Sequence, residues 1–319
     1  MRSVAVGILI FGGWVSLVAA ACAAGEEAAW WCGAMRHWAH LLAVGQLAIA
    51  AGLLLARRRR LGALVGASGL ALGALVAAAC APRDALAAPE GAPGRRLVFA
   101  YANLAYFSPE ISRVAPWVRA ASADIFVAAE TTDAHEAELA SLDDVFPYRY
   151  RSAAPVDAAN IAVRSRYPLQ NAAAYFPAGP LPQVVVDVAA PGGGFRLFAT
   201  HLFPPISAES TGWNDTSRGT LVARVRAAVD AGVPAVVVGD FNLAPWSTRV
   251  GDFEREASVL RAGRGRGLLI TWPDTPYFPW VGIPIDHVFV GGGVRVRALD
   301  VGPPIGSDHR GLVADLLLP

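Results

Sequence analysis

The sequence predicts an α/β protein in which three transmembrane helices precede a domain of two packed β-sheets with helices outside. Three observations predict this. Long stretches without charge fill the first 82 residues, short β-rich runs alternate with helical candidates after residue 95, and several of those runs are apolar at every position. Hydrophobic residues make up 54% of the 319 residues and charged residues 17%, which excludes a disordered chain and a wholly water-soluble one.

The three uncharged stretches cover 23, 20 and 22 residues, at positions 3–25, 37–56 and 61–82. A helix rises about 1.5 Å per residue, so roughly 20 residues cross the ~30 Å hydrocarbon core of a bilayer. The first stretch could instead be a cleaved signal peptide, because it ends in small residues. Two further stretches directly after it favour a retained anchor.

Charge predicts the orientation of these helices. The run Arg57 to Arg60 lies between the second and third stretches, and such basic loops stay in the cytoplasm. Everything after Pro82 is therefore expected outside it, which makes the chain a multi-pass protein of the cell (inner) membrane. His37 and His40, at the outer end of the second stretch, are expected in an aromatic belt rather than at a metal.

The three cysteines, Cys22, Cys32 and Cys80, fall near the outward ends of the same helices. One disulfide and one free thiol are expected there, with the pairing left open. The absence of cysteine from the rest of the chain excludes thiol catalysis and a cysteine zinc site in it.

Composition divides the chain into a membrane anchor at 1–82, a linker at 83–94 and a catalytic-sized domain at 95–319. The last part holds 20 arginines and 22 acidic residues, so it would not attract a polyanion by its overall charge. The one basic cluster, Arg261, Arg264 and Arg266, is expected to be a solvated loop.

Short apolar runs predict the strands of this domain, and residues 111–121, 135–142 and 218–231 are helical candidates. The expected strands are 97–102, 125–129, 161–163, 184–188, 195–200, 235–238, 285–290, 294–299 and 312–318.

Polar residues follow several of these strands. Asp240 and Asn242 come after a buried run and Gly239, and such a carboxylate and amide suit phosphoryl chemistry by orienting water and donating to a phosphoryl oxygen. Glu130 and Asn103 end two other strands with oxygen ligands suited to Mg²⁺ or Mn²⁺. Each residue alone is more often a turn or helix-start residue.

Histidines occupy similar positions. His201 ends a strand, and the dipeptides Asp286-His287 and Asp308-His309 come near the C-terminus. An aspartate that fixes the tautomer of a histidine gives a general base or an electrostatic stabiliser. Together these polar positions predict one shared site.

This ordered set resembles the endonuclease/exonuclease/phosphatase superfamily over nearly all of 95–319. The residues that carry the resemblance are Asn103, Glu130, Asn160 with Ser165-Arg166-Tyr167-Pro168, Thr200-His201, Gly239-Asp240-Phe241-Asn242, Asp286 and Ser307-Asp308-His309. Pro245-Trp246-Ser247 and Thr271-Trp272-Pro273 are similar to its membrane-anchored bacterial branch.

The resemblance implies a four-layer α/β sandwich and metal-dependent hydrolysis of phosphoesters. It assigns Asn103 and Glu130 to Mg²⁺ (or Mn²⁺), with Asp308 in support. The remaining roles are orientation of water and phosphate by Asp240 and Asn242, base or stabiliser for His309 paired with Asp286, leaving-group assistance by His201, and substrate binding by Asn160 and Arg166. The two histidine roles could be exchanged.

We therefore expect an extracytoplasmic, membrane-anchored phosphodiesterase that acts on a lipid-linked or small phosphodiester, with no obligate protein partner. Extracellular nucleic acid is the alternative substrate, although Leu104 and Ala105 replace the acid that some abasic-site nucleases carry after the asparagine. A catalytically silent, membrane-tethered scaffold is the alternative from another class. A transporter is disfavoured, because the spans are few and uncharged.

Overall fold

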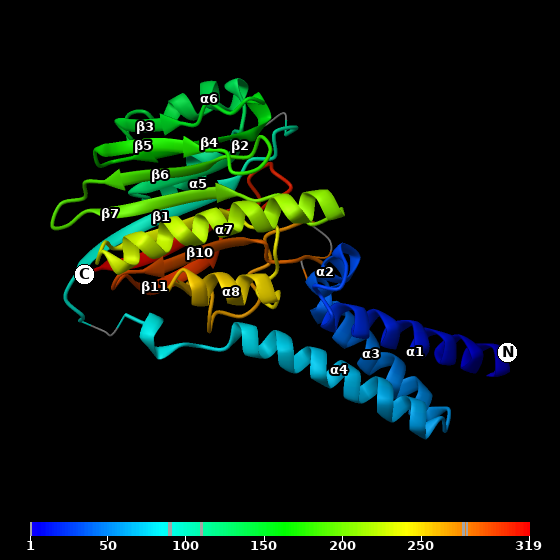
Figure 1. The fold of residues 1–319 in the computed structure, drawn as a ribbon. Helices are drawn as coiled ribbons and strands as arrows, with labels where there is room; N and C mark the ends of the chain where they lie inside the picture. The colour runs from blue at the N-terminus through cyan, green and yellow to red at the C-terminus, as the bar shows by residue number, and fades with distance from the viewer. Residues whose placement is uncertain (1, 89–90, 109–110, 276–277, 279) are drawn as a thin grey trace.

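Two β-sheets lie face to face, with helices on their outer faces and a group of helices leading away from one end (Figure 1). The computed structural model describes residues 2–88, 91–108, 111–275, 278 and 280–319. The predicted sandwich is confirmed. Its four layers are a helical layer, two six-stranded sheets of mixed direction and a second helical layer.

The first sheet has the order β11-β12-β1-β2-β4-β3 and the second the order β5-β6-β7-β8-β10-β9. The first contains β1 (Arg95–Asn103), β2 (Ile125–Thr131), β3 (Tyr148–Arg151), β4 (Asn160–Ser165), β11 (Arg295–Val301) and β12 (Leu312–Leu318). The second contains β5 (Leu169–Tyr175), β6 (Gln183–Val188), β7 (Phe195–His201), β8 (Ala235–Asp240), β9 (Leu260–Arg261) and β10 (Asp286–Gly291).

All nine expected strands are present, and β3, β5 and β9 were not expected. These three lie at sheet edges, where one neighbour suffices and an apolar run is not needed. The helices around the sheets are α5 (Val114–Ala120), α6 (Asp133–Leu139), α7 (Ala208–Asp230) and α8 (Thr248–Glu256), with short 3-10 helices η1 (Asp84–Leu86), η2 (Ala140–Leu142) and η3 (Asp157–Ala159).

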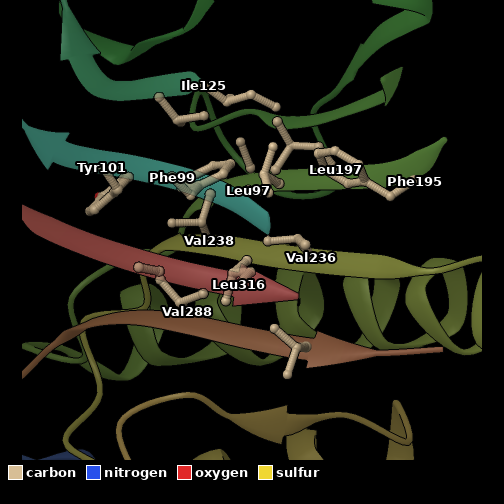
Figure 2. Packing of buried hydrophobic residues seen from close by; sticks show 14 of the residues in the cluster. Leu97, Phe99, Tyr101, Ile125, Phe195, Leu197, Val236, Val238, Val288 and Leu316 are labelled. Carbon is tan, nitrogen blue, oxygen red and sulfur yellow. The ribbon is translucent and has the colours of Figure 1, made fainter. Parts of the chain in front are cut away.

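The central strands are buried on both faces, as their continuous apolar runs predict. On β1, Leu97 and Phe99 point toward the other sheet, whereas Ala100 and Ala102 pack against α5. Figure 2 shows side chains from both sheets meeting in this core. The core fixes where each strand ends, and therefore where the polar residues after it lie.

Four helices precede the sheets: α1 (Arg2–Ala24), α2 (Trp30–His37), α3 (Ala39–Leu55) and α4 (Arg59–Cys80). Two segments, Val4–Ala24 and Arg59–Leu86, are long and apolar enough to cross a membrane. Helices α2 and α3 give a third span only if the two together are counted as one broken span, and they meet at a bend of 73°. The structure thus supports two or three spans, and the second expected stretch, 37–56, forms α3 directly after the bend at Trp38.

The cysteines form the expected one disulfide and one free thiol. Cys22 and Cys32 form a disulfide that joins α1 to α2, and Cys80 is free.

The arginine cluster, in contrast to its expectation, is not a solvated loop. Arg261 is buried and its guanidinium donates to the carbonyl of Ala79 at 2.8 Å, and Arg264 does the same at 3.2 Å. Cations suit the carbonyl end of a helix, so Arg261 and Arg264 cap α4, whereas Arg266 donates to the Arg297 carbonyl.

A buried ion pair fastens α2 to the sheet domain. The Glu26 carboxylate lies 3.1 Å from Arg36 Nε and 3.5 Å from Arg249, and it accepts hydrogen bonds from Ser247 Oγ and the Thr248 amide. Arg36 Nε also donates to the Trp246 carbonyl at 2.8 Å, and Trp246 Nε1 donates to the Arg36 carbonyl at 2.7 Å. The first turn of α8 is therefore bound to the N-terminal helices.

We expect Glu26→Gln to destabilise the full-length chain by about 3 kcal/mol, because breaking one side of a buried ion pair leaves Arg36 uncompensated. The unfolding temperature in detergent should fall by about 6 °C or more. Glu27→Gln is the matched control, since Glu27 is exposed. Equal unfolding temperatures for both variants would contradict this account.

Candidate active site

Three strand pairings bring the polar residues to one edge. In the first sheet, parallel β1 and β2 place Asn103 beside Ala129, the residue before Glu130. In the second sheet, parallel β7 and β8 place His201 opposite Asp240, and antiparallel β10 places Asp286 opposite Asp240 as well. The predicted shared site therefore exists where the two sheets end together.

The backbone at this edge is unusual in two respects. A Cβ atom on Gly239 would lie 1.9 Å from the Thr200 carbonyl oxygen, so only glycine allows β8 to approach β7 so closely before Asp240. Glu130 and Asn242 adopt left-handed conformations, with φ of 55° and 53°. Such conformations cost free energy and collect at functional sites. Glu130 lies where the pairing of β2 with β4 is irregular, and Asn242 follows the end of β8.

The side-chain amide of Asn103 links the carboxylates of Glu130 and Asp240. The Asn103 Nδ2 group donates to Glu130 Oε1 at 2.9 Å and to Asp240 Oδ2 at 3.2 Å. Its Oδ1 accepts from the Ala105 amide at 3.0 Å, so the oxygen that was expected to face a metal points to backbone. The second Asp240 oxygen accepts from the Asn242 amide at 2.7 Å.

His309 and Asp286 form a buried pair. His309 Nδ1 donates to Asp286 Oδ2 at 2.8 Å, and Nε2 lies 3.8 Å from Asp240 Oδ2. Burial alone would lower the pKa of His309, but the carboxylates of Asp286 and Asp240 outweigh it and raise this pKa to about 10. Burial opposes ionisation of Asp286 too, yet the charge of His309 brings the pKa of Asp286 below its usual value.

His201 faces the same carboxylates from the other side. Its Nε2 lies 3.7 Å from Glu130 Oε1 and 3.9 Å from Asp240 Oδ2. Burial lowers the pKa of His201. Burial and the nearby Asp286 charge raise the pKa of Asp240 well above its usual value. The site therefore combines the charged imidazole of His309 with the neutral imidazole of His201. It also holds the carboxyl group of Asp240, whose ionised form a nearby cation would stabilise.

A cavity of about 570 Å³ opens over these groups. Its polar lining comes from Glu130, His201, Asp240, Asn242, Asp308 and His309, among others, and the remaining lining is mainly apolar. Asn103 and Asp286 are buried behind them. A cavity of this size suits a small ligand.

The two predicted substrate-binding residues do not line this cavity. Asn160 is near the site end of β4, but its Oδ1 accepts from Ser152 Oγ and the Ala154 amide, so it orders the preceding loop. Arg166 follows the opposite end of β4 and donates to the Ala123 carbonyl. Since β4 runs antiparallel to β2, residues after it lie away from the site, which corrects the expectation for Arg166.

Other lining residues were not predicted as site residues. Ala34, His37 and Trp38, from α2 and the corner after it, form part of the cavity wall. No local pattern marks them, since they lie in the apolar N-terminal part. Trp272, quoted above only for the family resemblance, lines the cavity too and donates from Nε1 to Asp308 Oδ2 at 3.0 Å. Trp280 is 61% exposed.

The donor groups fit a hard divalent cation. Asp240, Asp286 and His309 offer ligand atoms within 4.8 Å of one another. His309 Nδ1 is already bonded to Asp286, and the oxygens of Glu130 and Asp240 accept hydrogen bonds from amide groups. The Glu130 side chain is the more exposed of these two carboxylates, at 15% against 2%. Carboxylate oxygens are the ligands that Mg²⁺ and Mn²⁺ prefer.

Two facing sheets with acids, an amide and imidazoles around one cavity define a hydrolase fold built for phosphoester chemistry. The chain belongs to the Endonuclease/Exonuclease/phosphatase family, whose model matches residues 100–309. Members of this family hydrolyse phosphoester bonds and depend on divalent metal ions. No curated protein sequence matches the chain significantly.

Solved structures share the fold at low identity. Truncated TDP2 of Caenorhabditis elegans is 16% identical with a TM-score of 0.57, over 70% of this chain and 98% of that chain. The endonuclease/exonuclease/phosphatase of Beutenbergia cavernae is 23% identical with a TM-score of 0.55, over 70% of this chain and 72% of that one. TDP2 of D. rerio, complexed with a single-strand DNA product, is 14% identical with a TM-score of 0.55, over 69% and 98%.

Proposed function

We propose that this chain is a membrane-anchored, extracytoplasmic, Mg²⁺-dependent phosphodiesterase of the membrane-anchored bacterial branch of its family. The observation that carries the proposal is the single cavity lined by Glu130, Asp240, His201 and His309. Carboxylates, a charged imidazole and a neutral imidazole around one space match what hydrolysis of a phosphodiester requires.

In this proposal Glu130 would hold the Mg²⁺ ion, with Asn103 behind it and Asp308 in support. The ion would neutralise charge on the phosphoryl oxygens. Asp240 orients the attacking water and accepts its proton, and Asn242 helps to position the phosphate. Since Asn242 Nδ2 already donates one hydrogen bond to the Leu202 carbonyl at 2.8 Å, its second hydrogen is the one left for substrate.

The charge on His309 favours the role of transition-state stabiliser over that of base. With a pKa near 10, its imidazole is protonated at neutral pH and donates from Nε2 toward the phosphoryl group. Asp286 is a positioning residue that holds this ring and its charge. His201, whose pKa burial lowers, keeps the role of assisting the leaving group in this proposal.

The test is hydrolysis of bis-p-nitrophenyl phosphate by the full chain in detergent. Activity should require Mg²⁺ or Mn²⁺, disappear with EDTA and fall to background in Asp240→Asn. If wild type hydrolyses neither this diester, nor phospholipid, nor DNA, and Asp240→Ala and His309→Ala leave a cellular phenotype unchanged, the scaffold alternative replaces the enzyme.

A lipid-linked or small phosphodiester is the favoured substrate, with no obligate protein partner. A nuclease acting on extracellular nucleic acid is the second candidate, favoured by the D. rerio TDP2 complex with single-strand DNA. The net negative charge of 95–319 speaks against long polyanions. Paired panels of lipids and oligonucleotides at one salt concentration separate the two.

The extracytoplasmic position rests on the Arg57 to Arg60 run and on the Cys22–Cys32 disulfide, which oxidising compartments maintain. The division into an anchor at 1–82, a linker at 83–94 and a domain at 95–319 stays a prediction. A reporter that is active only outside the cytoplasm, fused after Gly94, should be active. Activity of a cytoplasmic reporter at that point would contradict the orientation.

A further inference from the structure

The wall of the catalytic cavity is formed in part by the membrane helices. Ala34, His37 and Trp38 line the same cavity as Asp240 and His309. These residues belong to α2 and to the corner where the chain bends by 73° into α3. The active site of the sheet domain is therefore incomplete without a segment that directly follows the first candidate span.

This wall is held in place on both sides. The Cys22–Cys32 disulfide ties α2 to α1, and the Glu26 carboxylate with the reciprocal hydrogen bonds of Arg36 and Trp246 ties it to the sheet domain. His37 is 6% exposed, and its Nε2 has no hydrogen-bond partner among the described residues. This nitrogen is therefore open to a polar group of whatever fills the cavity beside it.

The rest of the wall is apolar and continues to the surface. Phe107 and Ile206 line the cavity and are 62% and 67% exposed. Trp31 and Met35, on α2, are also exposed. Bulky exposed side chains beside candidate membrane spans are suited to the boundary of a bilayer. The cavity thus has a polar floor for a phosphoester and an apolar side beside the membrane helices.

We propose that α2 is a substrate-binding element, and that its cavity wall receives the alkyl chain of a phosphodiester lipid presented by the same bilayer. This inference rests on the proposed phosphodiesterase activity and adds the substrate class and the element that selects it. The phosphate lies at the acidic and imidazole floor, and the chain extends along Ala34 and Trp38 toward the membrane.

The test compares p-nitrophenyl octyl phosphate with p-nitrophenyl methyl phosphate, which differ only in the alkyl group. Full-length wild type in detergent should prefer the octyl ester by at least about tenfold in kcat/KM, since two buried methylene groups suffice for that factor. Ala34→Trp fills the wall, so it should remove the octyl preference and bring kcat/KM for the octyl ester to that for the methyl ester.

Met35→Trp is the matched control, because Met35 is 41% exposed on the same helix and does not line the cavity. It should retain the octyl preference. A binding readout guards against a folding defect: dioctyl phosphate should raise the unfolding temperature of wild type and Met35→Trp, but not that of Ala34→Trp.

The outcomes separate this inference from the activity beneath it. Equal rates for the two esters in wild type, or equal losses of both in Ala34→Trp, would overturn the role of α2 and leave the phosphodiesterase intact. Loss of octyl preference in Met35→Trp would overturn it too. Hydrolysis of neither ester would refute the phosphodiesterase and this inference with it.

Discussion

His309→Ala should lower kcat for a phosphodiester by about 10³-fold, within the range that one acid, base or charged donor contributes. The substitution removes the charge that three carboxylates, Asp286, Asp240 and Asp308, maintain at the cavity. It acts on the transition state more than on the bound substrate, so KM should change much less than kcat.

Asp286→Asn is the informative companion variant. It keeps a group of the same shape beside His309 but removes the charge that raises the pKa of that imidazole, so the loss should be smaller and should grow with pH. Arg310→Ala is the matched control. Arg310 is the next residue in the same loop and pairs with Asp274 at 2.8 Å, and we expect its substitution to change kcat less than about twofold.

A loss in Arg310→Ala as large as that in His309→Ala would show that the loop, and not the imidazole, is what the reaction needs. A large loss confined to KM would place His309 in substrate binding alone. Either result would contradict the role proposed here.

Most of the strands could be predicted because a strand that is buried on both faces of a sandwich is apolar at every position. Val236 to Val238 are apolar at every position because one set of side chains faces the other sheet and the alternate set faces α7. A polar residue directly after such a strand then lies at the edge. This reasoning succeeds for Asp240 and His201, whose strands run parallel and end together.

The same reasoning fails where strand direction reverses. Arg166 follows an apolar run just as Asp240 does, yet β4 is antiparallel to β2 and carries Arg166 to the opposite end. Direction depends on the pairing of distant segments, which no local pattern records. The expectation that Arg166 binds substrate came from the family resemblance, and the antiparallel pairing of β4 does not support it.

The N-terminal part shows a second limit. Hydropathy predicts the presence of apolar helices, but it does not show that α2 precedes the second of them at a sharp bend and lines the cavity. Arg261 was misread for a similar reason, because its partner is the Ala79 carbonyl at the end of α4. In both cases the decisive contact joins residues far apart in the sequence.

Glu130→Ala should abolish activity and remove the response of the fold to metal. A ligand at a hundred times its dissociation constant stabilises a protein by about 2.7 kcal/mol, so saturating Mg²⁺ should raise the unfolding temperature of wild type by about 5 °C or more. Glu130→Ala should show no such rise, because it removes a carboxylate that lines the cavity and is more exposed than Asp240 and Asp286. Glu138→Ala, on α6, is the matched control and should keep the full response.

This variant also decides between two arrangements of donors. Asp240, Asp286 and His309 could hold a cation without Glu130, since their ligand atoms lie within 4.8 Å of one another. In that case Glu130→Ala would retain the metal-dependent rise and Asp286→Asn would lose it. The hydrogen bond between His309 and Asp286 argues against this outcome, because a cation there would have to displace a charged imidazole from a buried carboxylate. A wild-type response that survives in Asp286→Asn and vanishes in Glu130→Ala would place the cation on the Glu130 side of the cavity.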